Sequence, residues 1–215
     1  MYAFTDIALA AYCPRKLYYR WHEDEYDPPK RDERFELAFR YPELLDPDRR
    51  LQTEPIAVTP VTYRCNLGRA RARIDAFDSL CEPSSRETFL TGRQARGIAH
   101  KVLEDPLAPS IVSVGEPPET GVWGPQNVRA VAAAKALAWE RETPVDRAFI
   151  EYSTHGVVRE IELTARRVGQ YRRALRTAAS VDGPPSRTRN TSKCESCEYR
   201  PQCGVRTRSL RSLLG

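Results

Sequence analysis

Three cysteines near the end of the chain constrain its fold more than any other feature. Cys194, Cys197 and Cys203 form a C-x2-C-x5-C pattern, and six cysteines in 215 residues are too few for a disulfide scaffold. Closely spaced thiols in such a chain are more often metal ligands than disulfides. Three thiolates require a fourth ligand, and Cys13 is the best candidate. A metal group shared by these cysteines would close a long loop and fix both ends of the chain to each other.

The spacing of the thiols does not decide which metal they bind, because thiolates hold zinc as well as iron–sulfur clusters. One alternative to a four-cysteine site is a zinc knuckle whose fourth ligand is His155 or another residue, and another is no metal at all. The remaining cysteines, Cys65 and Cys81, fall on apolar positions of a predicted helix, so we expect both in the core.

The composition is that of an ordinary globular protein, with 40% hydrophobic and 29% charged residues. Its length lies within the range of one domain. No apolar run approaches the roughly 18 residues that a membrane-spanning helix needs, so we expect no membrane partner. The first residues lack a positive segment and Asp6 interrupts their apolar stretch, which argues against a signal peptide and favours a cytoplasmic protein.

All of the excess positive charge lies in the last 30 residues. Residues 186–215 hold seven basic and two acidic residues, whereas the other 185 residues hold 27 of each. Most of the basic residues are Arg, whose guanidinium group suits bidentate phosphate contacts. Such a cluster is typical of a polyanion partner or of a solvated tail. The candidate nucleic-acid-binding residues are Arg187, Arg189, Arg206, Arg208 and Arg211.

The middle of the chain predicts a single mixed α/β domain without internal repeats. Three strands, a long helix, two strands and a last helix follow one another. Pro125 opens the long alanine-rich helix, and Thr164 caps the last helix, which Gly183 ends. The expected strands cover residues 87–92, 97–104, 109–115, 147–153 and 157–163.

Helices are also expected before the sheet. Thr5 or Asp6 caps a first helix, which Pro14 separates from a second short one. A stripe of small residues predicts one continuous helix from Thr59 to Pro83. The domain then comprises an N-terminal helical segment in residues 1–22, a core in residues 55–182 and a basic cysteine-containing segment in residues 186–215. Residues 33–45, which precede the core, could form one more helix.

The segment CPRKLYY at Cys13 and the late cysteine pattern resemble the CRISPR-associated RecB-like exonucleases, the "Cas-four" family and its Dna-two relatives in the PD-(D/E)XK nuclease superfamily. The loop GEPPETGVWGP, followed by a helix that begins with Gln126, resembles the region after the family's catalytic strand. The resemblance covers nearly the whole chain apart from residues 22–54. It implies a restriction-endonuclease-like mixed sheet flanked by helices, with residues 55–182 as the nuclease-like core. It also implies an iron–sulfur clamp that joins the N- and C-terminal segments, a [4Fe–4S] cluster held by Cys13, Cys194, Cys197 and Cys203.

The residues that carry the family's nuclease chemistry are replaced at the expected positions. That chemistry needs a carboxylate on one strand and a Glu-x-Lys pair on the next, which bind a divalent metal and activate water. Alignment on the GEPP loop puts the Glu-x-Lys pair at Ile111 and Ser113, and the upstream carboxylate near Arg96. The family's upstream histidine has no equivalent, and its Gln-x-x-x-Tyr motif keeps Gln126 but has Ala130 in place of the tyrosine. We therefore assign no catalytic residue.

The residues leave three functions open. The resemblance implies a Cas-four-like iron–sulfur protein that binds single-stranded DNA or DNA ends, has a weakened or lost nuclease site, and acts with CRISPR integrase proteins in spacer acquisition and antiviral defence. The second function is an active Mg²⁺- or Mn²⁺-dependent exonuclease on single-stranded DNA. The third is a zinc-binding nucleic-acid adaptor. An active site would require displaced ligands, for which the nearby residues are His100, Lys101, Glu104, Asp105 and Glu116.

Overall fold

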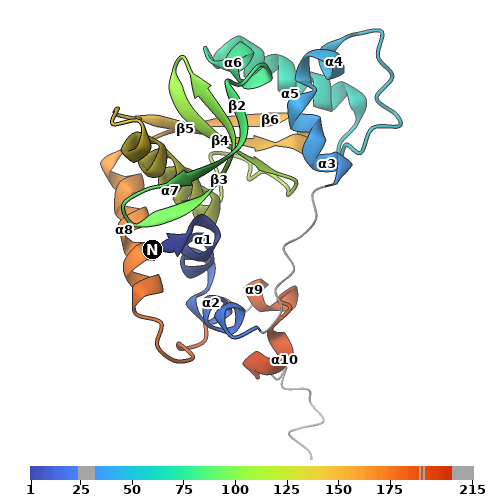
Figure 1. Ribbon diagram of the computed structural model, residues 1–215. Coiled ribbons are helices and arrows are strands. Elements are labelled where there is room, and N and C mark those ends of the chain that lie inside the picture. Colours follow the sequence, from blue (N-terminus) through green and yellow to red (C-terminus); the bar gives the residue numbers. More distant parts are fainter. Residues whose placement is uncertain (24–31, 189, 191, 205–215) are drawn as a thin grey trace, which may run out of the picture.

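The sheet at the centre of the protein has six strands in mixed orientation, with helices on both faces (Figure 1). The computed structural model describes residues 1–23, 32–188, 190 and 192–204. The α/β class and the helix-flanked mixed sheet expected from the sequence are confirmed. No helix among these described residues is both long and apolar enough to cross a bilayer.

Five of the six strands lie where apolar runs and turn residues predict them. They are β2 (Ser85–Thr91), β3 (Ala95–Glu104), β4 (Leu107–Ser113), β5 (Arg147–Tyr152) and β6 (Val157–Glu162). The sheet order is β1-β3-β4-β5-β6, with β2 antiparallel to β3. The additional strand, β1 (Tyr2–Ala3), pairs with β3 in parallel and is too short to leave a pattern in the sequence.

One face of the sheet is covered by three helices, α1 (Phe4–Tyr12), α7 (Gly124–Glu140) and α8 (Ala165–Ala179). The alanine-rich α7 packs against the strands from β2 to β5. It approaches so closely that a side chain at Gly92 would lie 2.8 Å from Ala136. Likewise, a side chain at Gly97 would lie 2.6 Å from the ring of Phe4, so glycine is required where α1 crosses β3.

The other face carries five shorter or more peripheral elements, grouped together in Figure 1. They are α3 (Glu33–Glu36), the 3₁₀ helix η1 (Leu37–Phe39), α4 (Tyr41–Leu45), α5 (Pro60–Arg73) and α6 (Phe77–Cys81). Successive strand residues point to opposite faces, so Ile111 belongs to the α7 layer and Val112 to the α5 layer. This alternation decides which residues of β3 and β4 can form a site together.

The predicted continuous helix from Thr59 to Pro83 is wrong. Thr59 caps α5 as expected, because its Oγ1 accepts a hydrogen bond from the Thr62 backbone N–H at 3.2 Å, but the helix ends at Arg73 and α6 follows separately. The buried face of α5 consists of Tyr63, Leu67 and Ala70, because burying the large side chains of Tyr63 and Leu67 removes more apolar surface from water than burying the predicted stripe of small residues.

Cys65 belongs to that stripe and is exposed, so its predicted place in the core is wrong as well. Cys81 is buried as expected, and burial raises the pKa of its thiol to about 11. Neither cysteine lies at the pocket where the other four meet. Substitutions of Cys65 and Cys81 can therefore serve as controls for substitutions of the four cysteines at the pocket.

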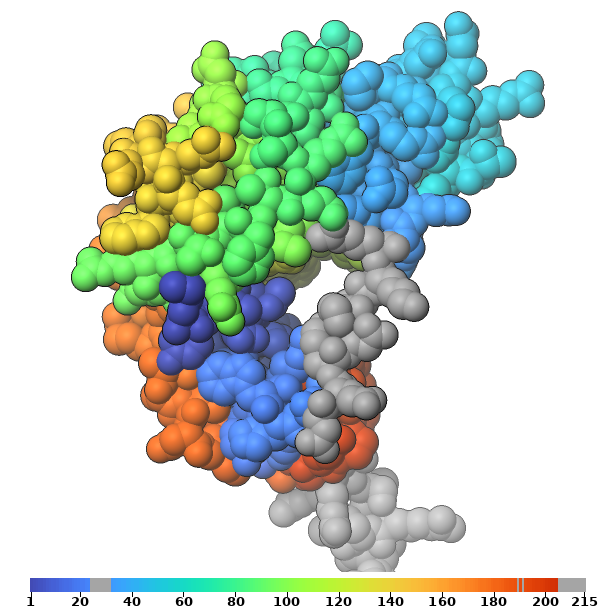
Figure 2. Space-filling view, in the orientation of Figure 1, coloured from blue at the N-terminus to red at the C-terminus, as the bar shows by residue number. Residues whose placement is uncertain are grey.

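The two ends of the described chain lie side by side. The first helix ends at Tyr12, and α2 (Pro14–Trp21) begins after Cys13, as Pro14 predicts. The predicted cap of α1 is wrong, because Ala3 occupies the cap position instead of Thr5 or Asp6. Two single-turn helices, α9 (Ser192–Glu195) and α10 (Arg200–Cys203), pack beside α2. Figure 2 shows this red C-terminal segment against the blue N-terminal one.

Candidate metal centre

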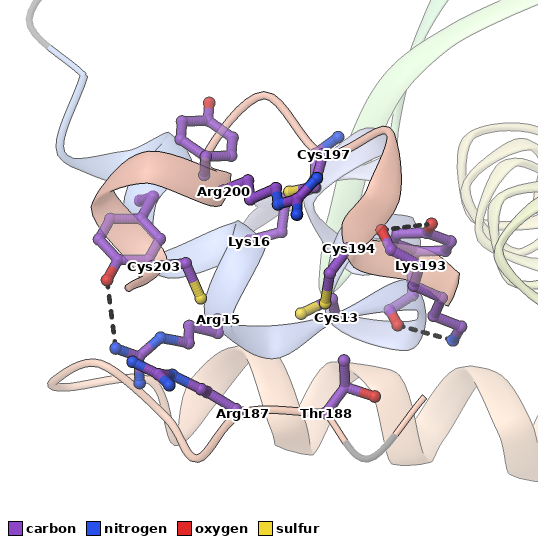
Figure 3. A pocket seen from close by; sticks show the side chains of 13 residues that line it. Cys13, Arg15, Lys16, Arg187, Thr188, Lys193, Cys194, Cys197, Arg200 and Cys203 are labelled. Atoms are coloured by element: carbon purple, nitrogen blue, oxygen red, sulfur yellow. Dashed lines mark hydrogen bonds between the residues drawn. The ribbon is translucent and has the colours of Figure 1, made fainter. Parts of the chain in front are cut away.

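Cysteines from both ends of the chain meet at one pocket. Cys13 lies at the junction of α1 and α2, Cys194 in α9, and Cys203 at the end of α10. Together with Cys197, they line a single cavity of about 190 Å³ (Figure 3). The structure thus brings together all four residues that the sequence predicts as metal ligands.

A reciprocal contact ties the first of these thiols to the second. The ammonium group of Lys193 donates to the backbone carbonyl of Tyr12 at 2.9 Å, and the Tyr12 hydroxyl donates to the carbonyl of Lys193 at 3.4 Å. The Lys193 ammonium also lies 4.7 Å from the centre of the Tyr12 ring. Tyr12 and Lys193 directly precede Cys13 and Cys194, so we call this pair the Tyr12–Lys193 clasp.

The other two late cysteines are held in the same way, through a sequence neighbour that contacts α2. Glu198, next to Cys197, forms an ion pair with Lys16 at 3.1 Å. The carbonyl of Gln202, next to Cys203, accepts a hydrogen bond from Tyr19 at 3.0 Å. Each of the three late cysteines is therefore next to a residue that contacts α2 or the end of α1.

The pocket is electropositive. Five basic side chains and no acidic one are among the described residues that line it, and the basic ones are Arg15, Lys16, Arg187, Lys193 and Arg200. Burial raises the pKa of the Cys194 thiol, and the neighbouring thiols of Cys13, Cys203 and Cys197 raise it further. Thiolates that share a pocket repel one another, so a metal group held by these cysteines would relieve that repulsion, and the surrounding basic side chains would balance the remaining negative charge.

The four cysteines line one cavity without forming a compact ligand group. The described part of the chain holds no group of three or more His, Cys, Asp or Glu side chains arranged to bind a metal ion. The cavity of about 190 Å³ is much larger than the about 10–15 Å³ that one water molecule requires. The four cysteine side chains offer an all-sulfur donor set, which zinc and iron–sulfur clusters both use.

His155 is not a fourth ligand of this pocket. It lies in the 3₁₀ helix η2 (Ser153–His155), where its Nδ1 is 2.9 Å from the Thr154 hydroxyl, and it does not line the cysteine cavity. The zinc knuckle that would use His155 is therefore not formed. Of the predicted nucleic-acid-binding residues, Arg187 lines the pocket, and the other four lie outside the described residues, namely Arg189, Arg206, Arg208 and Arg211.

Two of the three replaced nuclease positions, Ile111 and Ser113, lie on the face of the sheet that α7 covers. Ile111 is buried in the α7 layer, and Ser113, two residues along β4, accepts a hydrogen bond from the Gln126 amide at 2.9 Å. Gln126 in turn accepts a hydrogen bond from the hydroxyl of Tyr152 on β5. Arg96 is exposed near the start of β3 and takes no part in this network.

His100 on β3, one of the nearby residues that the sequence analysis names for a displaced site, contacts both β4 and α7. Its Nδ1 accepts a hydrogen bond from the backbone N–H of Val112 at 2.7 Å, and its Nε2 lies 3.3 Å from the guanidinium of Arg129 on α7. The sequence shows that His100 follows Gly97 by three residues, but not that His100 is buried beside Arg129.

The acids that were considered as displaced ligands do not share a site. Glu104 forms an exposed ion pair with Arg141 at 3.0 Å, and Asp105 lies in the turn before β4. Glu116 follows the other end of β4, which spans about 20 Å. A metal ion held jointly by these three carboxylates is therefore impossible in this fold.

Lys101 points to the opposite face from His100 and is fully buried. Its ammonium donates to Glu151 on β5 at 2.7 Å and to the carbonyls of Ala38 and Leu80. Glu151 also accepts a hydrogen bond from Ser110. This ion pair satisfies both charges internally, so neither Lys101 nor Glu151 is available to a substrate.

No family model matches the chain, and no curated protein matches it significantly.

Proposed function

We propose that this protein is an iron–sulfur, DNA-binding member of the RecB-like exonuclease family whose nuclease centre has lost its chemistry. The observation that carries the proposal is the convergence of Cys13, Cys194, Cys197 and Cys203 on one electropositive cavity. The four cysteines would hold a [4Fe–4S] cluster and clamp the N- and C-terminal segments together. The restriction-endonuclease-like core is part of the same proposal, supported by the mixed sheet and by the position of α7.

The loss of nuclease chemistry follows from the residues around β3 and β4. A divalent cation requires carboxylate or other oxygen ligands, and here the expected positions hold Arg96, Ile111 and Ser113. The guanidinium of Arg129 lies beside His100 and would repel a cation. Gln126 is then the one residue of the family's nuclease motifs that this chain keeps, and the centre no longer binds Mg²⁺ or Mn²⁺.

DNA is the proposed partner because the positive charge is concentrated beside the clamp. Arg15, Arg187 and Arg200 line the cysteine pocket, and the excess charge of the whole chain lies in residues 186–215. A protein that holds single strands or DNA ends without cutting them suits CRISPR spacer acquisition, in which an integrase would receive the DNA. That biological role rests on the family resemblance.

Two assays test the proposal on protein purified without oxygen. The protein should bind a fluorescent single-stranded oligonucleotide, and Cys13→Ser should lose its iron and bind more weakly, whereas Cys65→Ser should match the wild type. With Mn²⁺, cleavage should be no faster than that of a Glu104→Ala, Asp105→Ala, Glu116→Ala triple variant. Robust cleavage that the triple variant lacks would identify an active exonuclease instead.

A further inference from the structure

The last helix of the core, α8, concentrates positive charge on the outside of the molecule (Figure 1). Its 15 residues include five arginines and no acidic residue. Arg167 donates to the side chain of Asn127 at 2.7 Å. The other four arginines are exposed, and within the described chain their side chains form no hydrogen bond or ion pair. They are Arg166, Arg172, Arg173 and Arg176.

These four arginines share one side of the helix, which we call the arginine face. At 3.6 residues per turn they fall within an arc of about 120°, opposite the buried stripe that contains Tyr171 and Leu175. The arrangement costs the helix stability in two ways. Arg172 and Arg176 are four residues apart, where like charges repel, and Arg166 lies in the first turn, where positive charge opposes the helix dipole. Because no acid within α8 compensates these costs, an external anion explains the arginine face better than stability does.

Gly169 lies at the centre of the arginine face. A side chain there would meet no protein atom within 4 Å, so packing does not require glycine at this position. Glycine in a helix interior is destabilising relative to alanine, and it suits a place where a ligand must approach the backbone closely. A bare stretch of helix between guanidinium groups would let a phosphate chain lie directly against α8.

A pocket with an exposed aromatic ring adjoins the arginine face. Arg172 lines this cavity of about 270 Å³, together with Arg93 from the turn between β2 and β3. Lys135 and Trp139 line it from α7, and no acidic side chain is among the described residues around it. Trp139 is 57% exposed, which suits a base that stacks on its ring while the basic side chains contact the adjoining phosphates.

We infer that α8 and this pocket form a second binding surface for single-stranded DNA, with the arginine face on the phosphates and Trp139 against a base. The inference rests on the proposed DNA binding and adds a surface on the core, to which the cysteine segment contributes no residue. An anionic membrane suits this surface less well, because the outward side of α8 presents no large apolar side chain for insertion.

The test is the salt dependence of binding of a fluorescent oligodeoxythymidylate to the iron-loaded protein. Arg172→Gln combined with Arg176→Gln should lower the slope of log affinity against log salt by about 1.4, the value for two phosphate contacts on a single strand. The matched control is Arg69→Gln with Arg73→Gln, because these exposed arginines of α5 have the same spacing and also lie in a helix without acids. Trp139→Ala should weaken binding at least about fivefold and leave the slope unchanged, because stacking releases no counterions.

Two glycine variants separate binding from folding. Gly169→Gln should raise the temperature of thermal unfolding and yet weaken binding several-fold, because the new side chain covers the arginine face. Gly68→Gln on α5, where an added side chain also meets nothing within 4 Å, should raise that temperature and leave binding unchanged. Wild-type affinity in Gly169→Gln would contradict the close approach of a strand to the helix.

Three outcomes would overturn the inference. Equal salt slopes for the α8 double variant, the α5 double variant and the wild type would remove this surface while leaving the proposed function intact. Failure of the iron-loaded wild type to bind the strand at all would overturn both. If the slopes are equal and anionic phospholipid vesicles bind the wild type but not the α8 double variant, the surface belongs to a membrane instead.

Discussion

Tyr12 and Lys193 each bind the backbone of the other, and each is followed in the sequence by a cysteine of the candidate metal centre. The contact joins residues that are 181 positions apart. Because it holds together the backbone next to Cys13 and Cys194, it would preorganise these two cysteines as ligands of the proposed cluster. Preorganisation of ligands lowers the entropic cost of binding a metal group.

Weakening the Tyr12–Lys193 clasp should shorten the lifetime of the cluster. Lys193→Met removes the ammonium donor and should speed the loss of iron to a chelator several-fold, as followed by visible absorbance. Tyr12→Phe removes only the longer hydrogen bond of 3.4 Å and should have a smaller effect. Lys135→Met controls for the loss of a positive charge, and equal rates for all three variants would show that the clasp does not position the thiols.

The buried pair of Lys101 and Glu151 should be required for stability rather than for cleavage. Lys101→Met leaves the Glu151 carboxylate buried without its countercharge, which should cost about 3–5 kcal/mol in the free energy of unfolding. Adding Glu151→Leu should restore most of that loss, because an apolar pair of similar volume avoids the uncompensated charge. Urea denaturation measures both, and a double variant no more stable than the single one would contradict this account.

Two glycine substitutions should change stability in opposite directions. Gly156 has a φ of 62°, and a side chain there would lie 2.8 Å from the carbonyl oxygen of Tyr63, so Gly156→Ala should cost more than about 1–2 kcal/mol. Gly68 lies within α5 with nothing within 4 Å of an added Cβ, so Gly68→Ala should stabilise by roughly 0.5–1 kcal/mol. Thermal unfolding of the two variants, compared with the wild type, checks both signs.

The basic end of the chain should contribute phosphate contacts of its own. Neutralising Arg206, Arg208 and Arg211 together should lower the salt slope of single-strand binding by about two units, with little dependence on DNA sequence. Salt titrations of the triple variant with two unrelated oligonucleotides measure both effects. An unchanged slope at normal iron content would instead favour a protein partner or a solvated tail.

The sequence predicted most elements of the fold because their signals are local. Pro14 and Pro125 mark helix starts, and apolar runs bounded by turn residues mark the strands from β2 to β6. Local patterns failed at α5, where the buried face is set by contacts of Tyr63 and Leu67 with distant residues. For the same reason Cys65 was misplaced, since helical periodicity alone does not say which face is buried.

The same difference between local and long-range signals applies to the candidate site. Spacing identified three of the four cysteines that line the pocket, because ligand spacing is itself a local signal, whereas Cys13 was only the best candidate for a fourth ligand. The pairing of Lys101 with Glu151 and that of His100 with Arg129 each depend on which residues the sheet and α7 bring together. Such contacts between separate elements leave no periodic trace in one sequence, and so they had to be seen in the structure.

The most direct test of the iron–sulfur clamp is the iron and sulfide content of protein purified without oxygen. The wild type, Cys65→Ser and Cys81→Ser should contain about four iron and four sulfide per chain. Cys13→Ser, Cys194→Ser, Cys197→Ser and Cys203→Ser should each lose most of both, together with the brown colour. One zinc per chain and no iron in the wild type would contradict the account.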